Sequence, residues 1–440
     1  MSVTNRSEIR VGILGAGTVG HGILNLLRDN AKTVEARLGA PIHVRRVVAR
    51  DRAKSRDSMI PAERLSFDPA EVIADPEIDI VVEVMGGLEP AHTLIRQAIE
   101  AGKHVVTANK ALIAEHGDAL IELAEKKGVD LYFEAAVAGG IPILRVLREA
   151  LASDRVVSLS GIVNGTSNYI LSRMQSGNVE FADALREAQE KGYAEADPTL
   201  DVGGGDAAQK LTILATLAYG ARLVPKDVHT VGIDAVGAVD MRFADRFGYV
   251  IKPIAVAKRA HAGQLDLRVH PALVAKTHPL ATVNGALNVI YLEGAMLGPC
   301  IISGLGAGAL PTAMSVVSDI MDVARNLMVG AHSRVPVRAY QGTSLEVQPV
   351  QPIGELRARH YLRVPVRDLP GVLAQVAGAL GKHGVSIEQM VQDQKLPGTD
   401  ATSIVLLTHE AKDAEVRSAL EELTKLETVL ERPRVLRIEE

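Results

Sequence analysis

Residues 9 to 27, IRVGILGAGTVGHGILNLL, constrain the fold most, because an apolar run, a spaced glycine pattern and a second apolar run follow one another. The first run predicts a buried strand and the last a helix. Gly15, Gly17 and Gly20 stand between them in GxGxxG spacing, which permits a tight turn, a close approach of a pyrophosphate and close helix–strand packing. The stretch therefore predicts a dinucleotide-binding turn, and the alternative is a plain strand-to-helix turn. The expected cofactor contacts are Gly15, Ala16, Gly17, Thr18, Val19 and Gly20.

Strand-like and helix-like segments alternate from residue 78 to residue 137. Such alternation predicts a parallel, doubly wound sheet of the Rossmann type, in which ligands lie beyond the carboxyl ends of the strands. Gly86, Gly87, Asn109 and Lys110 fall at such ends. Lys110 is thus a candidate contact for cofactor or substrate, with a solvent-exposed lysine at a helix start as the competing interpretation.

The second expected strand, IHVRRVVAR, ends at Arg50 and is followed by Asp51. In this fold an arginine there accommodates the 2'-phosphate of NADP, whereas an acidic residue selects the 2'-hydroxyl of NAD. Arg50 therefore favours NADP, and Asp51 leaves NAD open. The spacing from Gly20 is longer than usual, so a solvated charged loop is the alternative.

Composition narrows the class of protein. A chain of 440 residues has room for about two to four domains. A formal net charge of -5 gives no electrostatic case for nucleic acid or an anionic membrane as partner. The single cysteine, Cys300, cannot form an internal disulfide, and no apolar run is long enough to span a bilayer. We expect a cytoplasmic protein whose partners are small molecules or protein.

A charged, glycine-rich stretch, KGYAEADPTLDVGGGDAAQKL, precedes an apolar helix-like segment near residue 211. If the helix begins near Asp206, that carboxylate and Lys210 stand four residues apart on one face. The helix N-terminus favours the carboxylate and disfavours the ammonium, so the pair is suited to proton transfer. An ordinary surface ion pair is the alternative.

Two further small-residue segments are candidates for close backbone approach. The turn EAAVAGGIP, from Glu134, could hold a hard cation through its carbonyl groups, although small residues beside a cofactor serve without an ion. In the run SGLGAGALPTA, Gly308 and its neighbours would allow backbone close to the cofactor before a long helix.

The order of segments predicts an α/β protein of several parts. Residues 360 to 440 read strand, helix, strand, strand, helix, strand, a ferredoxin-like βαββαβ order. The expected parts are a Rossmann domain at 1–140 completed by about 305–340, a mixed α+β catalytic and dimerisation domain at 141–304, a linker at 341–356 and a βαββαβ domain at 357–440.

Six blocks resemble those of homoserine dehydrogenases with a C-terminal ACT domain, and together they span essentially the whole chain. They are GILGAGTVG, TANKALIA, NGTSNYIL, KGYAEADPTLDVGGGDAAQKL, SGLGAGALPTA and DLPGVL, of which the third and fourth are the most specific. The resemblance implies site residues. The catalytic set is Lys210, Asp206 and Lys110; the substrate set is Glu195, Asp201, Asn164, Gly165, Thr166 and Tyr193; cofactor contacts also include Arg50, Lys110, Gly192 and Gly308; and the sodium site is Glu134, Val137, Gly139 and Ile141.

The implied reaction is the NAD(P)H-dependent reduction of L-aspartate 4-semialdehyde to L-homoserine, on the route to threonine, methionine and isoleucine. The resemblance further implies a homodimer or homotetramer and feedback inhibition by threonine through the ACT domain. One rival is another amino-acid oxidoreductase on the same scaffold, such as an aspartate dehydrogenase. The other is an amino-acid sensor, which would be free to lose Glu195, Asp206 and Lys210, yet all three are present.

Overall fold

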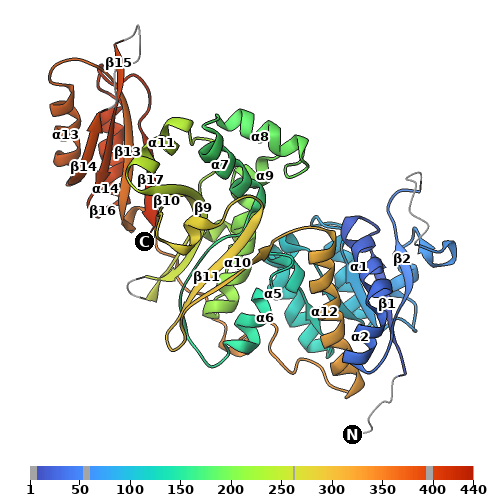
Figure 1. Cartoon of the computed structure of the whole chain (residues 1–440). Coiled ribbons are helices and arrows are strands. Elements are labelled where there is room, and N and C mark those ends of the chain that lie inside the picture. Colours follow the sequence, from blue (N-terminus) through green and yellow to red (C-terminus); the bar gives the residue numbers. More distant parts are fainter. Residues whose placement is uncertain (1–6, 53–59, 261–262, 393–399, 440) are drawn as a thin grey trace. The chain divides into compact units, whose positions relative to one another are not determined.

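The computed structural model describes residues 7–52, 60–260, 263–392 and 400–439 (Figure 1). Contacts divide them into two compact units. The first holds the described residues up to Leu159, with Ala208–Val228 and Leu287–Gln348; the second holds Ser160–Ala207, His229–Ala286 and the described residues from Pro349 onward. These units follow contacts, and the domain boundaries expected from the sequence stay a prediction.

A parallel sheet with the strand order β3-β2-β1-β4-β5-β6 is the centre of the first unit. This is the Rossmann order, so the expected doubly wound sheet is confirmed. The strands are β1 (Ile9–Leu14), β2 (Ile42–Val48), β3 (Leu65–Ser66), β4 (Ile80–Glu83), β5 (His104–Thr107) and β6 (Leu131–Tyr132). The helices are α1 (Thr18–Asp29), α2 (Ala31–Leu38), α3 (Ala70–Ile73), α4 (Ala91–Glu100) and α5 (Lys110–Lys127).

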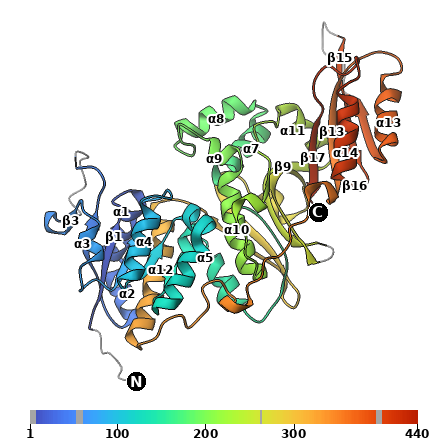
Figure 2. The same cartoon turned by 180° about the vertical axis from the view of Figure 1, so that it is seen from behind.

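Segments from later in the chain complete this unit. Helix α12 (Ala309–Met328) lies beside α1 in both views of the molecule (Figures 1 and 2). The two helices approach so closely that a Cβ on Gly22 would lie 2.5 Å from the carbonyl oxygen of Ala309. The unit also contains the short helix α6 (Ile143–Arg145) and the antiparallel pair β11 (Leu287–Gly294) and β12 (Gly298–Leu305).

The second unit has a mixed sheet whose strands follow the order β7-β9-β10-β17-β13-β15-β14. These are β7 (Val156–Ile162), which begins in the first unit, β9 (Tyr249–Arg259), β10 (Leu265–Ala275), β17 (Arg434–Glu439), β13 (Arg357–Arg367), β15 (Ala401–Thr408) and β14 (Ile387–Gln392), with β8 (His229–Thr230) on β10 and β16 (Ala411–Lys412) on β13. The helices are α7 (Gly165–Gly177), α8 (Phe181–Glu190), α9 (Thr199–Val202), α11 (Ala238–Arg246), α13 (Val372–Lys382) and α14 (Asp413–Leu423); α10 (Gly205–Tyr219) begins here and continues into the first unit.

The C-terminal module has the expected βαββαβ order, β13-α13-β14-β15-α14-β17. Side chains of its first strand, β13, enter two different cores in turn, because successive side chains of a strand point to opposite faces. Leu362 and Val364 pack with α13 and α14, whereas Tyr361 packs with residues of α7 and α11. The module therefore shares a core with the rest of the second unit.

Strand β17 joins this module to the neighbouring sheet. It pairs antiparallel with β13 and parallel with β10, with Ala272 opposite Arg437 and Val274 opposite Glu439. The sequence predicts a polar linker before the last module. The structure shows in addition that strand pairing through β17 joins this module to β10, which the linker does not imply. Among the described residues, no helix is long and apolar enough to cross a membrane.

Candidate active site

The glycine pattern after β1 forms a turn whose middle is open. Gly15 has φ +123, and a Cβ there would lie 2.8 Å from the carbonyl oxygen of Val84. A Cβ on Gly20 would lie 2.2 Å from the Gly15 oxygen. The same position on Gly17, which caps α1, meets no atom within 4 Å. Two glycines thus allow the turn to close, and the third leaves space for a ligand to approach the backbone.

The end of β2 lies against this turn, since the Gly15 amide donates to the Val48 oxygen at 3.0 Å. Arg50 follows two residues later and is exposed, as is Asp51. Arg52 instead stacks its guanidinium over the Phe67 ring, 4.9 Å from the centroid. Arg50 thus lies just beyond the end of the strand at which this fold recognises the ribose.

The ends of β4 and β5 carry a polar cluster. Glu83, which is fully buried, accepts hydrogen bonds from the Thr107 hydroxyl at 2.6 Å and from the Met85 amide at 2.7 Å. Asn109 caps α5 and donates to the Gly87 oxygen at 2.6 Å, and the half-buried Lys110 is the first residue of that helix. Glu83 is not among the site residues expected from the sequence, although a carboxylate at the end of an apolar parallel strand is a usable signal.

Asn164 organises the polar centre of the second unit. It caps α7, and its side-chain oxygen accepts the Ser167 amide at 2.8 Å. Its amide nitrogen donates to Asp201 Oδ1 and to Asp206 Oδ2, each at 2.7 Å. Asn164 and Asp206 are 5 % and 4 % exposed, whereas Asp201 is half-buried, so one amide group holds a buried and a half-buried carboxylate.

The turn Gly203–Gly205 brings these carboxylates to the start of α10. Gly204 has φ +85, and a Cβ there would lie 2.8 Å from Thr230 Cγ2. Helix α10 begins at Gly205, as the sequence predicts, so Asp206 lies in its first turn and the half-buried Lys210 one turn later. Asp206 is a buried, hydrogen-bonded carboxylate, unlike a member of a surface ion pair.

Hydrogen bonds tie the segment before α9 to α7. Thr166 donates its hydroxyl proton to the Tyr193 oxygen at 2.6 Å, while a Cβ on Gly165 would lie 2.8 Å from the Ala286 oxygen. The Tyr193 side chain is 46 % exposed. Gly192 has φ +73 with no atom near its Cβ position, and Glu195 is exposed. The structure therefore brings Asn164, Asp201 and Asp206 together, whereas no contact among the described residues joins the Glu195 carboxylate to them.

The expected cation loop has an unexpected side-chain arrangement. The Glu134 carboxylate is 3 % exposed and accepts the amides of Leu144 and Arg145, at 2.9 and 2.8 Å. Its own backbone amide donates to Asp319 at 2.7 Å. Burial, together with the nearby Asp319 carboxylate, raises the pKa of Glu134. The Glu134 side chain thus fixes the start of α6.

The loop backbone itself is compact and packs closely against a second segment of the chain. Ala138 has φ +49, and a Cβ on Gly139 would lie 2.9 Å from the Gly306 oxygen. The Ile141 oxygen accepts the Ile143 amide at 2.8 Å. Gly308 follows shortly after Gly306 in the sequence. It has φ +120 and caps α12. The described residues hold no group of three or more His, Cys, Asp or Glu suited to a metal.

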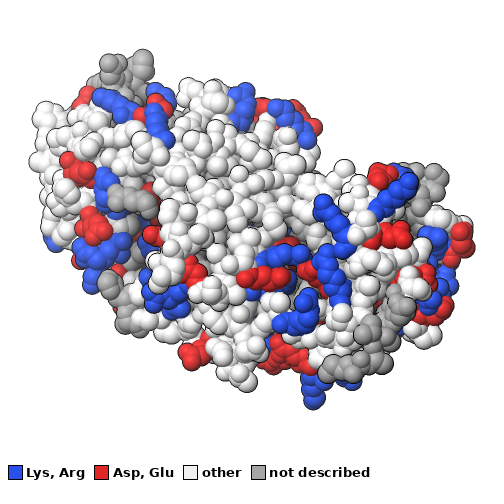
Figure 3. All heavy atoms as spheres, turned by 60° about the horizontal axis from the view of Figure 1, so that its bottom comes forward, with Lys and Arg blue, Asp and Glu red and all other residues white. Residues whose placement is uncertain are grey.

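Charges of both signs are interspersed on the face shown in Figure 3. That face therefore presents no extended surface of one sign.

Models of three families match successive parts of the chain. "Homoserine dehydrogenase, NAD binding domain" matches residues 15–134, "Homoserine dehydrogenase" matches 142–321 and "ACT domain" matches 360–428. The homoserine dehydrogenase of Pseudomonas aeruginosa is 44 % identical, with 96 % of each chain covered, and that of Neisseria gonorrhoeae is 42 % identical, with 98 % of each covered.

Solved structures agree with these matches. A homoserine dehydrogenase from Thiobacillus denitrificans has a TM-score of 0.92 at 44 % identity, with 98 % of each chain covered. A hyperthermophilic archaeal homoserine dehydrogenase in complex with NADPH has a TM-score of 0.61 at 27 % identity, covering 72 % of this chain and 97 % of that one. These relatives favour homoserine dehydrogenase over the aspartate dehydrogenase and the sensor.

Proposed function

This chain belongs to the homoserine dehydrogenase family, oxidoreductases that act on a CH–OH group, and we propose that Lys210 is its general acid in the reduction of L-aspartate 4-semialdehyde. The observation that carries the proposal is the hydrogen-bonded Asn164–Asp201–Asp206 cluster at the start of α10, one helical turn before Lys210.

The proposed roles follow from where charge develops during the reaction. The bound nicotinamide supplies a hydride to the aldehyde carbon, and the carbonyl oxygen becomes an alkoxide that needs one proton. Lys210 donates that proton, and Lys110 polarises the carbonyl as negative charge grows. Asp206 accepts a hydrogen bond from Asn164 and thereby places a negative charge one helical turn before Lys210. Asp201 accepts a second hydrogen bond from the same Asn164 amide nitrogen and so helps to hold it in place.

Recognition of an amino acid requires a partner for its ammonium group. We assign this role to Glu195, because a carboxylate forms a strong charge-assisted hydrogen bond with an ammonium. The hydrogen bond from the Thr166 hydroxyl to the Tyr193 oxygen holds the backbone of Gly165 and Tyr193 in place on the side of the site that carries Glu195. Glu195 is exposed, so its carboxylate is accessible to a substrate.

The cofactor assigned here is NADPH, with NADH as the weaker alternative. The turn fits a dinucleotide, because the open position at Gly17 leaves room for a pyrophosphate at the start of α1. The exposed Arg50 supports the preference for the 2'-phosphate. Gly192 and Gly308 are proposed as further backbone contacts to the cofactor. Both have positive φ, and as glycines they leave the backbone uncovered.

A monovalent cation, Na⁺, is assigned to the loop that carries Glu134, Val137, Gly139 and Ile141. The neutral carbonyl groups of a compact small-residue turn suit a hard cation of low charge. The Glu134 side chain contributes indirectly, because it already accepts two backbone amides and so holds the loop in place.

The ACT domain match supports regulation by an amino acid, and threonine is the proposed effector because it is a product of the proposed pathway. The same pathway would supply methionine and isoleucine. We further propose a homodimer, which pairing of ACT modules could extend to a tetramer.

A steady-state assay tests the reaction. NADPH and NADH oxidation are followed with L-aspartate 4-semialdehyde, with and without threonine, in sodium and in potassium buffer. We expect faster oxidation of NADPH, inhibition by threonine and a higher rate in sodium. No oxidation of either cofactor would contradict the reaction, while equal rates with and without threonine would contradict only the regulation.

A further inference from the structure

Glu83, the last residue of β4, is a fully buried carboxylate whose partners are all hydrogen-bond donors. Its Oε1 accepts the amides of Met85 and Gly86, at 2.7 and 3.1 Å, and its Oε2 accepts the Thr107 hydroxyl at 2.6 Å. Burying a charge is costly unless hydrogen bonds or a counter-ion offset the lost hydration. The three donors supply this compensation at the carboxyl edge of the sheet, where ligands bind in this fold.

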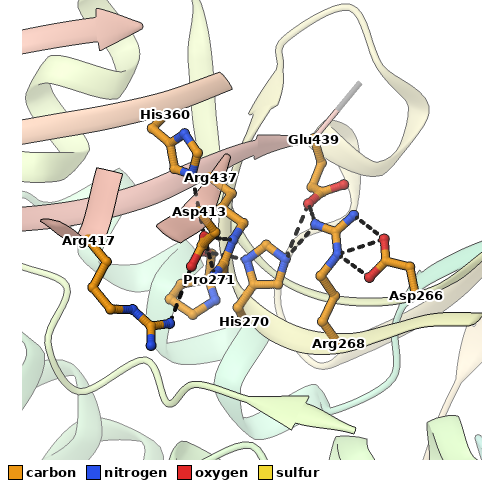
Figure 4. Close-up of polar contacts among 9 residues, drawn as sticks. All are labelled: Asp266, Arg268, His270, Pro271, His360, Asp413, Arg417, Arg437 and Glu439. Carbon is orange, nitrogen blue, oxygen red and sulfur yellow. Dashed lines mark hydrogen bonds and ion pairs between the residues drawn. The ribbon is translucent and has the colours of Figure 1, made fainter. Parts of the chain in front are cut away.

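A buried carboxylate elsewhere in the chain is neutralised by a cation instead. Asp266 on β10 is 4 % exposed and accepts hydrogen bonds from Arg268 Nε and Nη2, each at 2.9 Å, as Figure 4 shows. Among the described residues, Glu83 forms no ion pair. The carboxylate of Asp266 therefore joins a charge pair, whereas that of Glu83 gathers backbone amides and a hydroxyl.

Thr107 connects the Glu83 carboxylate to the residues that begin α5. It is the last residue of β5, lies opposite Glu83 in the sheet register and is 0 % exposed. Its hydroxyl oxygen accepts the Asn109 amide at 3.0 Å. Because an amide nitrogen can only donate, the hydroxyl proton is directed to Glu83. The hydroxyl therefore holds the Asn109 backbone at a fixed place relative to the end of β4.

The Asn109 side chain closes this connection with two further hydrogen bonds. Its Oδ1 accepts the Leu112 amide at 3.2 Å, which caps α5, and its Nδ2 donates to the Gly87 oxygen at 2.6 Å. Gly87 directly follows the two amides that bind Glu83. A closed network, called here the strand-end network, thus joins Glu83, the turn 85–87, Thr107, Asn109 and the first turn of α5.

Lys110 is the first residue of α5 and follows the strand-end network directly. Its side chain is half-buried. A lysine side chain is long and has many rotamers, so a fixed backbone limits the places that its ammonium reaches. Such limits matter for a reacting group, because a misplacement of about 1 Å can lower a rate roughly 100-fold.

The strand-end network also lies beside the dinucleotide turn. The Val84 amide donates to the Leu14 oxygen at 2.9 Å, and a Cβ on Gly15 would lie 2.8 Å from the Val84 oxygen. Gly86 has φ +73, and no atom lies within 4 Å of its Cβ position. The start of α5 is therefore fixed relative to the backbone that borders the proposed cofactor position.

We propose that Glu83 is a positioning residue: through the Thr107 hydroxyl, its carboxylate holds the start of α5 and so places the Lys110 ammonium at the substrate carbonyl. The inference rests on the proposed role of Lys110 and deepens it by naming the group that places this side chain. Both carboxylate oxygens of Glu83 are engaged by the protein, so it acts through Lys110 and contacts no substrate.

NMR of the full chain after reductive methylation of its lysines with labelled formaldehyde tests the geometry without turnover. Lys110→Arg assigns the Lys110 signal by its disappearance. Thr107→Val removes the hydroxyl and leaves both backbone amides on Glu83. We expect this variant to move the Lys110 signal, and Thr107→Ser, which keeps the hydroxyl, to restore it. An unmoved Lys110 signal in Thr107→Val would overturn the proposal.

Thr408→Val is the matched control for loss of a buried hydroxyl. Thr408 also ends a strand, is 0 % exposed, and accepts the His360 amide on its hydroxyl at 3.0 Å. This variant should leave the Lys110 signal and the basal kcat unchanged. If it moves the Lys110 signal as far as Thr107→Val does, the effect is a general one and the proposal fails.

A double-mutant cycle then tests whether Glu83 acts through Lys110. Glu83→Gln should lower kcat about tenfold in the wild-type background, since the placement of Lys110 is lost. In the Lys110→Met background the same change should lower kcat less than about twofold further, because the group to be placed is absent. Equal fold losses in both backgrounds would give Glu83 a role independent of Lys110 and overturn the proposal.

The two experiments separate this inference from the function on which it rests. A wild-type chain that does not oxidise NADPH with L-aspartate 4-semialdehyde, but whose Lys110 signal moves in Thr107→Val, would contradict the proposed function alone. An active chain whose Lys110 signal is the same in Thr107→Val would contradict the positioning role alone.

Discussion

The two glycine-rich turns that precede helices α1 and α10 differ in what their glycines meet. In the turn after β1, Gly17 has no atom within 4 Å of its Cβ position. In the turn before α10, each Cβ position is blocked by protein: at 2.7 Å by the Thr199 oxygen for Gly203, at 2.8 Å by Thr230 for Gly204 and at 2.9 Å by Leu200 for Gly205.

This difference indicates two uses of glycine. The first turn keeps a position free for a ligand that approaches the backbone, as expected of a phosphate-binding turn. The second turn uses glycine for tight packing, so that Asp201 and Asp206 reach the same Asn164 amide. Substitution of Gly17 in the first turn should therefore be tolerated structurally but weaken cofactor binding, whereas substitution in the second turn should lower stability and turnover together.

The largest effect is expected for Gly204→Val. A β-branched residue is strained at φ +85 and would collide with Thr230. We expect the free energy of unfolding to fall by about 3 kcal/mol or more and kcat to fall more than about 100-fold. Urea unfolding and steady-state kinetics measure both. A variant with wild-type stability would show that the second turn is no more tightly packed than the first.

Gly17→Val is the reciprocal test. The residue has φ -90, which valine can adopt, and its Cβ would meet no protein atom. We expect the Kd for NADPH to rise roughly 50-fold, while the free energy of unfolding changes by less than about 1 kcal/mol. Fluorescence titration of NADPH gives the Kd. Unchanged NADPH binding would remove the distinction between the two turns.

Asn164→Ala tests the second turn through the residue that donates hydrogen bonds to both of its carboxylates. The change removes the cap of α7 and leaves two carboxylates without their shared donor. We expect kcat/KM for the semialdehyde to fall about tenfold and the free energy of unfolding to fall by about 2 kcal/mol. Asn109→Ala is the matched control, since Asn109 caps α5 in the first unit. Because Asn109 also precedes Lys110, a second control is Glu415→Ala, which removes a helix cap at the start of α14, outside the candidate site. A loss of kcat/KM in Glu415→Ala equal to that in Asn164→Ala would contradict a special role for Asn164.

The smallest effect is expected for Arg50→Ala beside the first turn. Loss of one exposed charge-assisted hydrogen bond to the 2'-phosphate should lower the NADPH-to-NADH ratio of kcat/KM about fivefold. Arg52→Ala is the control, because Arg52 stacks on Phe67. If Arg52→Ala changes the ratio and Arg50→Ala does not, the assignment of Arg50 is wrong.

Much of the fold could be predicted from local sequence patterns. Apolar runs separated by glycine turns predict the parallel sheet of the first unit, and the alternation of strands and helices predicts the C-terminal module. The start of α10 at Gly205 also follows from the glycine run and the apolar segment after it. In each case the signal lies within about 20 residues, where helix and strand periods are visible.

The remaining features depend on contacts between distant residues. The pairing of β17 with β10 could not be predicted, because no local period specifies which strands become neighbours. The same holds for the Glu134 carboxylate, which accepts the amides at the start of α6. A substrate contact for Asn164 stays a prediction, and the local sequence could not show that its protein partners are two carboxylates about 40 residues further along the chain.

The most direct test of the account is hydride transfer by Lys210→Ala at saturating NADPH, measured in a single turnover with L-aspartate 4-semialdehyde. Removal of a general acid should slow transfer by about 10²- to 10⁴-fold, and the Kd for NADPH should stay unchanged because the dinucleotide turn is intact. Transfer at a near wild-type rate, with NADPH bound normally, would contradict the proposal that the second turn exists to position Lys210 and its carboxylates.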